Sequence, residues 1–264
     1  ICVSVSGCND SQKVHMIQGM SDGFRMKIIA TFSDRRVKEL VEDLRLYDRN
    51  VYSYPAKDLI FYQADIHGNR LATERIRTLR RIADGLPLTI VTTFDALMNA
   101  QVPLSVFTEH ILKIKKRGIV EESKLAASLV EMGYTRNYQV EEPGQFSIRG
   151  GIVDVFDLTE ENPYRIELWG DEVDSIRSFD ILSQRSIENL ESVSVYPATE
   201  IILSKEQLQT GLKKIETDMK KNYEVFRKEF KTEEAHRIKT QVEELKEDLT
   251  QLGRMTNLES YIDY

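Results

Sequence analysis

Cysteine and histidine are scarce in this sequence, and the few that occur are poorly placed for binding a metal. The chain contains only two cysteines and four histidines, which are Cys2, Cys8, His15, His67, His110 and His236. The histidines are scattered, so no zinc-ligand spacing is present. Two thiols in a chain of this length are typical of a reducing cytosol rather than of a disulfide-rich secreted domain. We therefore expect a cytoplasmic protein without a metal site.

Long apolar runs and an excess of basic residues are also missing. No apolar run approaches the ~20 residues that a membrane-spanning helix needs. The formal net charge is -7, from 36 Lys and Arg against 43 Asp and Glu. Surfaces that bind DNA through its phosphates are usually basic, so this charge argues against DNA as a partner of the chain alone. The 41% hydrophobic and 30% charged residues are typical of a soluble globular protein.

The two ends of the chain carry no start or stop signal. The sequence begins without Met and without a signal-peptide pattern, and it ends in "LESYIDY" without a turn or a cap. We therefore expect a segment of a longer protein. Its 264 residues are enough for two hydrophobic cores.

The first 110 residues alternate strand-like and helix-like patterns. Strands are expected at Ile1–Val5, in "MKIIATF" as a strand buried on both faces, in "NVYSY" and in "LTIVTT". Ser33 and Asp34 offer an N-cap ahead of apolar residues at i, i+3, i+4 and i+7, and another helix is expected from about Asn69 to Ala83. This repetition predicts a parallel sheet covered by helices.

Two further regions with different patterns follow. Residues 111–197 contain one short helix and then period-two strands with Gly and Pro turns, which predict a small, mainly antiparallel domain inserted into the first. Residues 198–264 are charged and helical, and two apolar stripes predict a pair of antiparallel helices, packed on each other or on the first domain. The stripe residues are Leu208, Leu212, Ile215, Met219, Phe226 and Phe230, then Ile238, Val242, Leu245, Leu249 and Leu252.

The stretch "SGCNDSQKV" has the spacing of a phosphate-binding loop, G-x-x-x-x-G-K-[ST], with two departures. Gly7 and Lys13 fit the pattern, whereas Gln12 occupies the second glycine position and Val14 the hydroxyl position. Gln12 places a side chain where the backbone approaches phosphate, and Val14 has no oxygen for magnesium. We expect no ATP hydrolysis at this loop. The match is either accidental or a degenerate relic, and its expected place after a buried strand favours the relic.

A second stretch, "GDEVD" at residues 170–174, imitates the acidic box that holds magnesium in helicases. That box normally ends a wholly apolar strand, whereas the preceding "YRIELWG" alternates in polarity. We interpret it as a solvent-facing turn, and we expect no catalytic residue in the chain.

The inserted region predicts a face suited to binding another protein. Strand alternation sends Ile166 to one side of "PYRIELWG" and Arg165, Glu167 and Trp169 to the other. The same rule sends Arg149 of "GQFSIRGG" outward, so one face would display two arginines and the only tryptophan of the chain. Arg and Trp are the residue types most enriched at interface hot spots. This composition favours a protein-docking surface.

Each of these residues also has a structural interpretation. Arg149 could be a solvated turn residue beside two glycines. Arg165 could pair with a cross-strand neighbour or with Glu167. Trp169 could lie under the 182–192 loop as part of the core.

The same strands resemble a known family. Between residues 144 and 200 the chain contains, in order, "RGGIVDVF", "YRIELW", "GDEVDS" and "SQRS". These motifs resemble the UvrA-binding domain shared by the nucleotide excision repair protein UvrB and the bacterial transcription-repair coupling factors (Mfd). The resemblance is strongest over residues 138–200 and covers the rest of the chain more loosely.

The resemblance implies a fold and a choice between these two relatives. Residues 1–110 and 198–264 would form a degenerate, helicase-like α/β domain of the P-loop NTPase kind, interrupted at 111–197 by a small α+β UvrA-binding domain. UvrB resembles an active helicase, with an intact phosphate loop and a long aromatic hairpin. The degenerate loop and the short, aromatic-poor segment between Pro55 and Arg75 match the N-terminal module of a coupling factor instead.

The function that the resemblance implies is recruitment of UvrA without ATPase activity. The family's UvrA contacts fall by position on Arg149, Arg165 and Trp169, the last in place of a common phenylalanine. No cofactor is expected in this chain, since ATP and magnesium would serve a motor elsewhere in the longer protein. That protein would be a DNA translocase that binds double-stranded DNA and displaces stalled RNA polymerase. The alternative is a UvrB-type subunit with ATPase and damage-verification activity.

Overall fold

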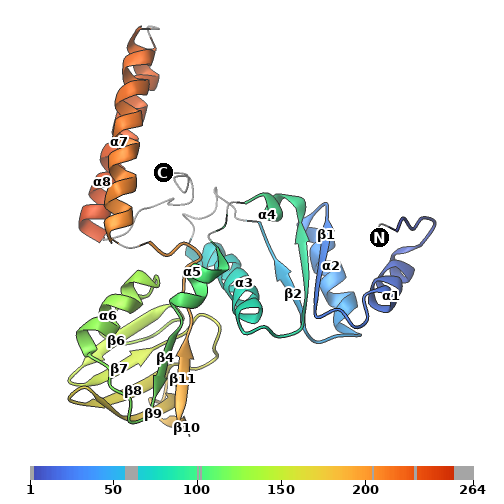
Figure 1. Cartoon of the computed structure of the whole chain (residues 1–264), viewed down its shortest axis with the longest axis horizontal. Helices are drawn as coiled ribbons and strands as arrows, with labels where there is room; N and C mark the ends of the chain where they lie inside the picture. Colours follow the sequence, from blue (N-terminus) through green and yellow to red (C-terminus); the bar gives the residue numbers. More distant parts are fainter. Residues whose placement is uncertain are drawn as a thin grey trace. The chain divides into compact units, whose positions relative to one another are not determined.

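The computed structural model describes residues 3–56, 65–99, 101, 103–203, 205–228 and 231–252. The chain divides into two compact units, Ile1–Glu200 and Ile201–Tyr264. Figure 1 follows the first unit from a small sheet with its helices to a second, larger sheet.

A three-stranded parallel sheet forms the first part of unit 1, with the order β1-β3-β2. The central strand β3 is buried at every residue, as the apolar run "LTIVTT" predicts. The alternation of strands and helices is confirmed over this part. Its elements are α1 (Asp10–Met20), β1 (Met26–Thr31), α2 (Asp34–Arg45), β2 (Val51–Tyr54), α3 (Asp65–Ala83), β3 (Leu88–Thr93), α4 (Phe94–Met98) and α5 (Leu104–Glu109).

Helices cover both faces of this sheet. Ser33 caps α2 by accepting a hydrogen bond from the Arg36 N–H, and the predicted apolar stripe of α2 is buried against Val91 of β3. Ile82 of α3 packs in the cluster that contains Ile90. Because successive strand residues point to opposite faces, Val91 and Ile90 are covered by different helices.

Two expectations at the N-terminal end are wrong. Residues 3–5 form no strand, and Val3 and Val5 are exposed, while Ile1 and Cys2 lie outside the described residues. Strand β1 is not buried on both faces, since its residues alternate between exposed and half-buried and one of its faces is open to solvent. No described strand therefore leads into the loop at Gly7, and the P-loop type of sheet is not observed.

The second part of unit 1 is built on a six-stranded sheet, with the order β10-β9-β8-β7-β6-β5. All its neighbouring strands are antiparallel except β5 and β6, which agrees with the period-two pattern. The elements are β4 (Leu112–Lys115), α6 (Glu122–Glu131), β5 (Thr135–Arg136), β6 (Gln145–Arg149), β7 (Ile152–Val155), β8 (Tyr164–Trp169), β9 (Glu172–Phe179), β10 (Ser186–Asn189) and β11 (Ser192–Val195).

The inner face of this sheet packs against α6. Leu125, Leu129 and Met132, which the sequence places on one helix face, share a buried cluster with Phe146 and Ile166. Beside the sheet, β4 and β11 form a separate antiparallel ribbon, labelled side by side in Figure 1. The chain thus enters and leaves the second part through paired strands.

Two arginines of α3 connect the two parts of unit 1. Arg75 is buried, donates to the Glu200 carboxylate and to the Tyr54 hydroxyl, and lies over the Tyr54 ring. Arg80 donates to Glu160 at 2.6 Å (Nη1 to Oε1) and lies over the Tyr196 ring. These contacts fix the segment that leaves β11 against the helix of the parallel sheet.

A buried acid lies at the same junction. Asp157 is fully buried and accepts hydrogen bonds from the N–H groups of Tyr196 and Thr159, each at 2.8 Å, and from the Thr159 hydroxyl. Burial raises the pKa of Asp157, and the hydrogen bonds from Tyr196 and Thr159 oppose that rise.

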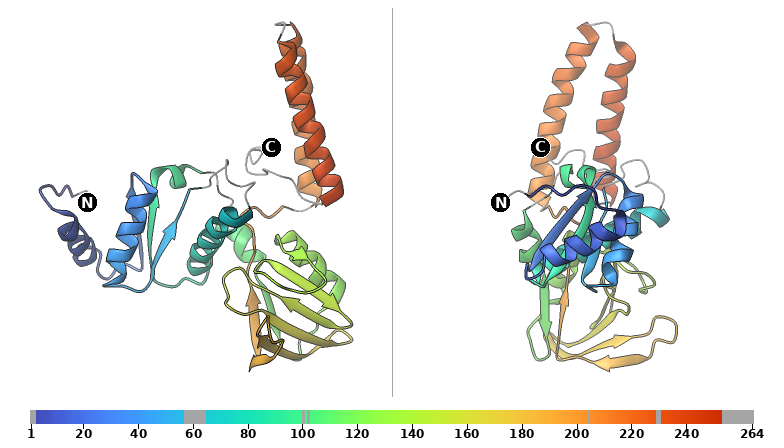
Figure 2. Two further views of the ribbon diagram at one scale, coloured as in Figure 1. Left: turned by 180° about the vertical axis from the view of Figure 1, so that it is seen from behind. Right: turned by 90° about the vertical axis from the view of Figure 1, so that its right-hand side faces the viewer.

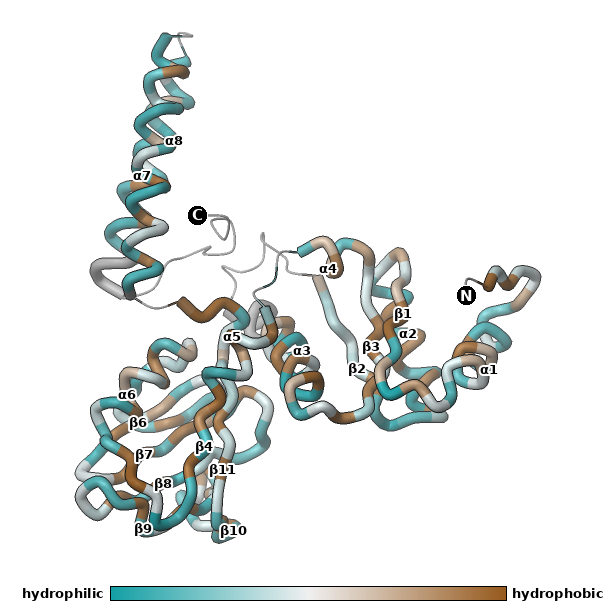
Figure 3. The backbone as a smooth tube through the Cα atoms, viewed as in Figure 1, coloured by the Kyte–Doolittle hydropathy of each residue, from teal (hydrophilic) through white to brown (hydrophobic). Residues whose placement is uncertain are grey.

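Unit 2 contains two long helices, α7 (Lys205–Lys228) and α8 (Thr232–Leu252), which lie side by side in Figure 2. Figure 3 shows them mostly hydrophilic, interrupted by hydrophobic positions. Ile215, Val242 and Leu245 from the predicted stripes form their buried seam. Packing of the helices on each other is confirmed. Phe230 lies outside the described residues, and completion of a helicase-like domain by this pair stays a prediction.

Candidate protein-docking surface

Alternation along β8 separates two kinds of side chain, as predicted. Ile166 is buried on the inner side, whereas Arg165, Glu167 and Trp169 point to the opposite side, which we call the outer face. An irregularity in β9 after the Glu167 pair shifts the register by one residue, so that Trp169 pairs with Glu172 instead of Val173.

The tryptophan stands beside a tight turn. Gly170 and Asp171 connect β8 to β9, and Gly170 adopts φ +61°, a conformation that glycine reaches without strain. Trp169 is 85% exposed, so the alternative that it is buried under the 182–192 loop is wrong. The interpretation of "GDEVD" as a solvent-facing turn holds for Gly170 and Asp171, while Glu172 to Asp174 continue into β9.

One buried carboxylate brings the two predicted arginines together. Asp154 on β7 lies between β6 and β8, and its side chain is 1% exposed. Arg165 donates to it twice, at 2.7 Å from Nε and 2.8 Å from Nη2, and Arg149 donates from Nη2 at 3.2 Å. We call these three residues the Asp154 cluster. Within this cluster the Arg149 side chain is 37% exposed and the Arg165 side chain is 14% exposed, so Arg149 is the more accessible of the two.

The loop after β9 fixes the orientation of Arg165. Gln184 accepts a hydrogen bond from Arg165 Nη2 at 2.9 Å and donates its own amide to the Ile181 carbonyl. The Arg165 guanidinium also lies 4.2 Å from the centre of the Phe179 ring. Hydrogen bonds to Asp154 raise the pKa of Arg165 above its ordinary value, so its charge is permanent at physiological pH.

A second ion pair lies next to the Asp154 cluster on the outer face. Arg177 pairs directly with Arg165 across the strands, and its guanidinium donates to Glu167. The Ser175 hydroxyl donates to the other carboxylate oxygen of Glu167 at 2.6 Å. Glu167 therefore contacts Arg177 rather than Arg165. Arg165 instead pairs with Asp154, its direct neighbour on β7, so the interpretation that Arg165 pairs across the strands is confirmed.

The structure also shows what sequence reasoning missed. Asp154 and Gln184 position Arg165, and Tyr138 lies beside Arg149, with the guanidinium 5.7 Å from the ring centre. Asp154 could have been found, because it stands outward on the strand between the two arginine-bearing strands. No sequence signal identifies Tyr138, which lies in a loop after β5.

The residues of the degenerate phosphate loop lie at the N-terminus of α1 and help to cap it. Asn9 caps α1 by accepting a hydrogen bond from the Gln12 N–H at 2.8 Å, and the Gln12 side chain accepts one from the Asn9 N–H. Lys13 pairs with Asp10 at 3.1 Å (Nζ to Oδ1), and Val14 is buried. Gly7 has φ +79° in the preceding loop. The loop thus has a structural role that uses Gln12, one of the two residues that depart from the motif.

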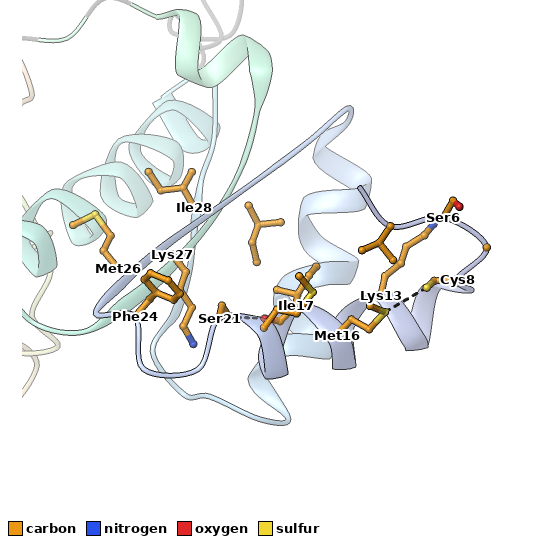
Figure 4. A pocket seen from close by; sticks show the side chains of 14 residues that line it. Ser6, Cys8, Lys13, Met16, Ile17, Ser21, Phe24, Met26, Lys27 and Ile28 are labelled. Atoms are coloured by element: carbon orange, nitrogen blue, oxygen red, sulfur yellow. Dashed lines mark hydrogen bonds between the residues drawn. The ribbon is translucent and has the colours of Figure 1, made fainter. Parts of the chain in front are cut away.

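A cavity of about 730 Å³ opens beside this loop. Figure 4 shows its lining from α1 and β1, with the Lys13 side chain extending toward Ser6. The lining is mainly apolar, including Met16, Phe24 and Met26. It lies apart from the outer face, which belongs to the other sheet, and its lining includes Lys13, Lys27 and two serines but no carboxylate.

Metal and membrane features are not found in the described part of the chain. No group of three or more His, Cys, Asp or Glu residues there could hold a metal ion. Among the described helices, none combines the length and the apolar character needed to cross a bilayer.

Residues 112–201, which include the outer face, match the family described as UvrB interaction domain. This class of domain covers β4 to β11 and the start of the following segment. The resemblance indicated by the sequence motifs is therefore confirmed.

Curated relatives extend the match beyond that domain. The chain is 33% identical over 230 residues to the transcription-repair-coupling factor of Bacillus subtilis, covering 81% of this chain and 20% of the relative. It is 31% identical over 241 residues to the transcription-repair-coupling factors of Staphylococcus aureus strains Mu50 and USA300, covering 84% of this chain and 20% of each. The chain thus resembles a module of transcription-repair-coupling factors and spans about a fifth of their length.

Proposed function

We propose that this chain is the UvrA-recruiting module of a transcription-repair coupling factor. The observation that carries the proposal is Trp169, 85% exposed on the same face as the Asp154 cluster. An indole and guanidinium groups held in place before binding lose little conformational freedom on association, which is the usual basis of an interface hot spot. In this proposal Trp169, Arg165 and Arg149 contact UvrA.

The proposed module binds a protein and does not hydrolyse ATP. In support, Gln12 and Lys13 are engaged in capping α1 and in an ion pair, and Val14 provides no oxygen. ATP and magnesium would act in a motor elsewhere in the longer, cytoplasmic protein, which would also carry the contacts to RNA polymerase and double-stranded DNA. The rival function, a UvrB-type subunit with its own ATPase, gains no support from this loop.

Titration of purified UvrA against Trp169→Ala tests the proposal most cleanly. We expect a loss of about 2 kcal/mol in binding free energy, the usual hot-spot scale, with unchanged thermal stability because the side chain is exposed. Arg165→Ala should weaken binding by a similar amount, but it also breaks the Asp154 cluster, so circular dichroism must confirm that it is folded. Wild-type affinity of Trp169→Ala would exclude the proposed docking face.

An ATPase assay separates recruitment from the rival function. We expect no magnesium-dependent turnover above the background of a matched Lys13→Ala variant. Turnover that disappears in Lys13→Ala would instead favour the UvrB-type function.

A further inference from the structure

Tyr138 is an exposed aromatic residue at the edge of the outer face, and its backbone is well anchored. It is 84% exposed. The Asn137 N–H before it donates to the Phe146 carbonyl, and Val140 after it is buried. The Gln145 side chain accepts from the N–H of Glu141 at 2.9 Å, which fixes the far end of the loop. The ring is thus presented to solvent on an ordered segment.

The charges of the outer face identify its most available cation. Among the described residues, the carboxylates that contact Arg149, Arg165 and Arg177 are those of Asp154 and Glu167. Arg149 makes the longest of these contacts, 3.2 Å, and its side chain is the most exposed of the three arginines. Its guanidinium therefore keeps the most capacity to bind a further anionic group.

Tyr138 and Arg149 lie together at this point. The guanidinium carbon of Arg149 is 5.7 Å from the centre of the Tyr138 ring, within the range of a cation–π contact. A partner that approaches this edge meets a flat apolar ring and a guanidinium side by side. This pair suits a carboxylate side chain flanked by apolar atoms.

We propose that Tyr138 is an additional contact for UvrA, forming with Arg149 a joint site for an acidic side chain next to an apolar one. The inference rests on the proposed docking of UvrA and extends that surface to the β5 edge of the sheet. Tyrosine is enriched at interface hot spots because it offers a large rigid contact area at low entropic cost. Tyr138 adds its own contact to the partner and does not act only by orienting Arg149.

Titration of UvrA against Tyr138→Ala in the full chain is the test. We expect about a tenfold loss of affinity, a typical hot-spot effect, and Tyr138→Phe should retain most of the affinity because it keeps the ring. Tyr47→Ala is the matched control, since Tyr47 is also exposed and lies against another ring, that of His15, in the parallel-sheet part. It should leave the affinity unchanged.

Two comparisons give the result its meaning. If Tyr138→Ala binds UvrA with wild-type affinity while Trp169→Ala binds it more weakly, the Tyr138 contact is wrong and the proposed docking function stands. If both variants bind UvrA with wild-type affinity, the proposed docking function itself is wrong. In an Arg149→Ala background, the loss caused by Tyr138→Ala should persist. Its disappearance there would show that Tyr138 only positions Arg149, which also overturns the proposed contact.

Discussion

The outer face and the loop at Gly7 both carry the outline of a functional site, but only the outer face brings its residues together. On the outer face, three neighbouring strands place Arg149, Asp154 and Arg165 within hydrogen-bonding distance. At the loop, Gln12 and Lys13 instead form contacts within their own helix terminus.

This difference shows when a motif defined by residue spacing predicts a functional site. The arginine positions follow from strand alternation, which has a period of two and is set by the backbone itself. The phosphate-loop motif depends on a preceding strand that aims the loop at a ligand, and the described residues 3–5 form no strand. A motif indicates a site only where the fold supplies the element that the chemistry needs.

The largest expected effect comes from removing the carboxylate shared by the two arginines. Asp154→Ala should lower the free energy of unfolding by about 3 kcal/mol, the lower end for breaking a buried ion pair, because Arg149 remains partly solvated. Urea denaturation measures it. Glu188→Ala, at an exposed position of β10, is the control and should change stability by less than about 0.5 kcal/mol. Equal stability of both variants would mean that the cluster does not support the outer face.

An intermediate effect is expected at the other region. Asn9→Ala should cost about 1 kcal/mol of stability by removing the cap of α1. If the loop serves only this helix, adding ATP and magnesium should raise the melting temperature of neither the wild type nor the variant. A nucleotide-dependent rise in the wild type that is lost on Lys13→Ala would reverse our interpretation of the loop.

The smallest expected effect is on how the free energy of unfolding depends on pH, and it concerns the carboxylates of Asp157 and Asp180, which lie in contrasting surroundings. The pKa of Asp157 is raised by burial, so the folded state holds its proton more tightly than the unfolded state. Its contribution to stability should therefore fall as the pH rises from about 3.9 through the folded pKa. Unfolding free energies of wild type minus Asp157→Asn, measured from low to neutral pH, should show that decline.

For Asp180, the contribution to stability should change with pH in the opposite direction. Hydrogen bonds from Ser183 lower its pKa, so its contribution is present above the ordinary carboxyl pKa and is lost as the pH falls. The wild type minus Asp180→Asn difference should rise with pH. If both differences changed in the same direction, burial would not be the main influence on Asp157.

Much of the fold could be predicted because its elements carry strong local patterns. The stripe of α2 with its Ser33 cap, the buried strand β3 and the alternation of β8 all appear as expected. One error is local, since residues 3–5 form no strand, and the other concerns what covers a strand, which no local pattern reveals. The apolar run of β1 suggests burial on both faces, yet the face that carries Met26 and Ile28 is exposed.

The candidate site was partly predictable for the same reason. Alternation places Arg149, Arg165 and Trp169 on one face and also turns Asp154 outward, but it does not show which strands are neighbours. Asp154 and Gln184 become partners of Arg165 only through β-strand pairing and the conformation of the 180–185 loop. The expected absence of an aromatic hairpin falls partly on residues 57–64, which lie outside the described residues, and stays a prediction.

The ribbon of β4 and β11 has a consequence for how this module can be handled. Leu112 pairs with Val195, so the points where the chain enters and leaves are only about 5 Å apart. A segment whose ends meet so closely can be transplanted as a cassette into a surface turn of an unrelated carrier without stretching the host. Grafting the segment bounded by this ribbon would carry the outer face to an unrelated carrier protein.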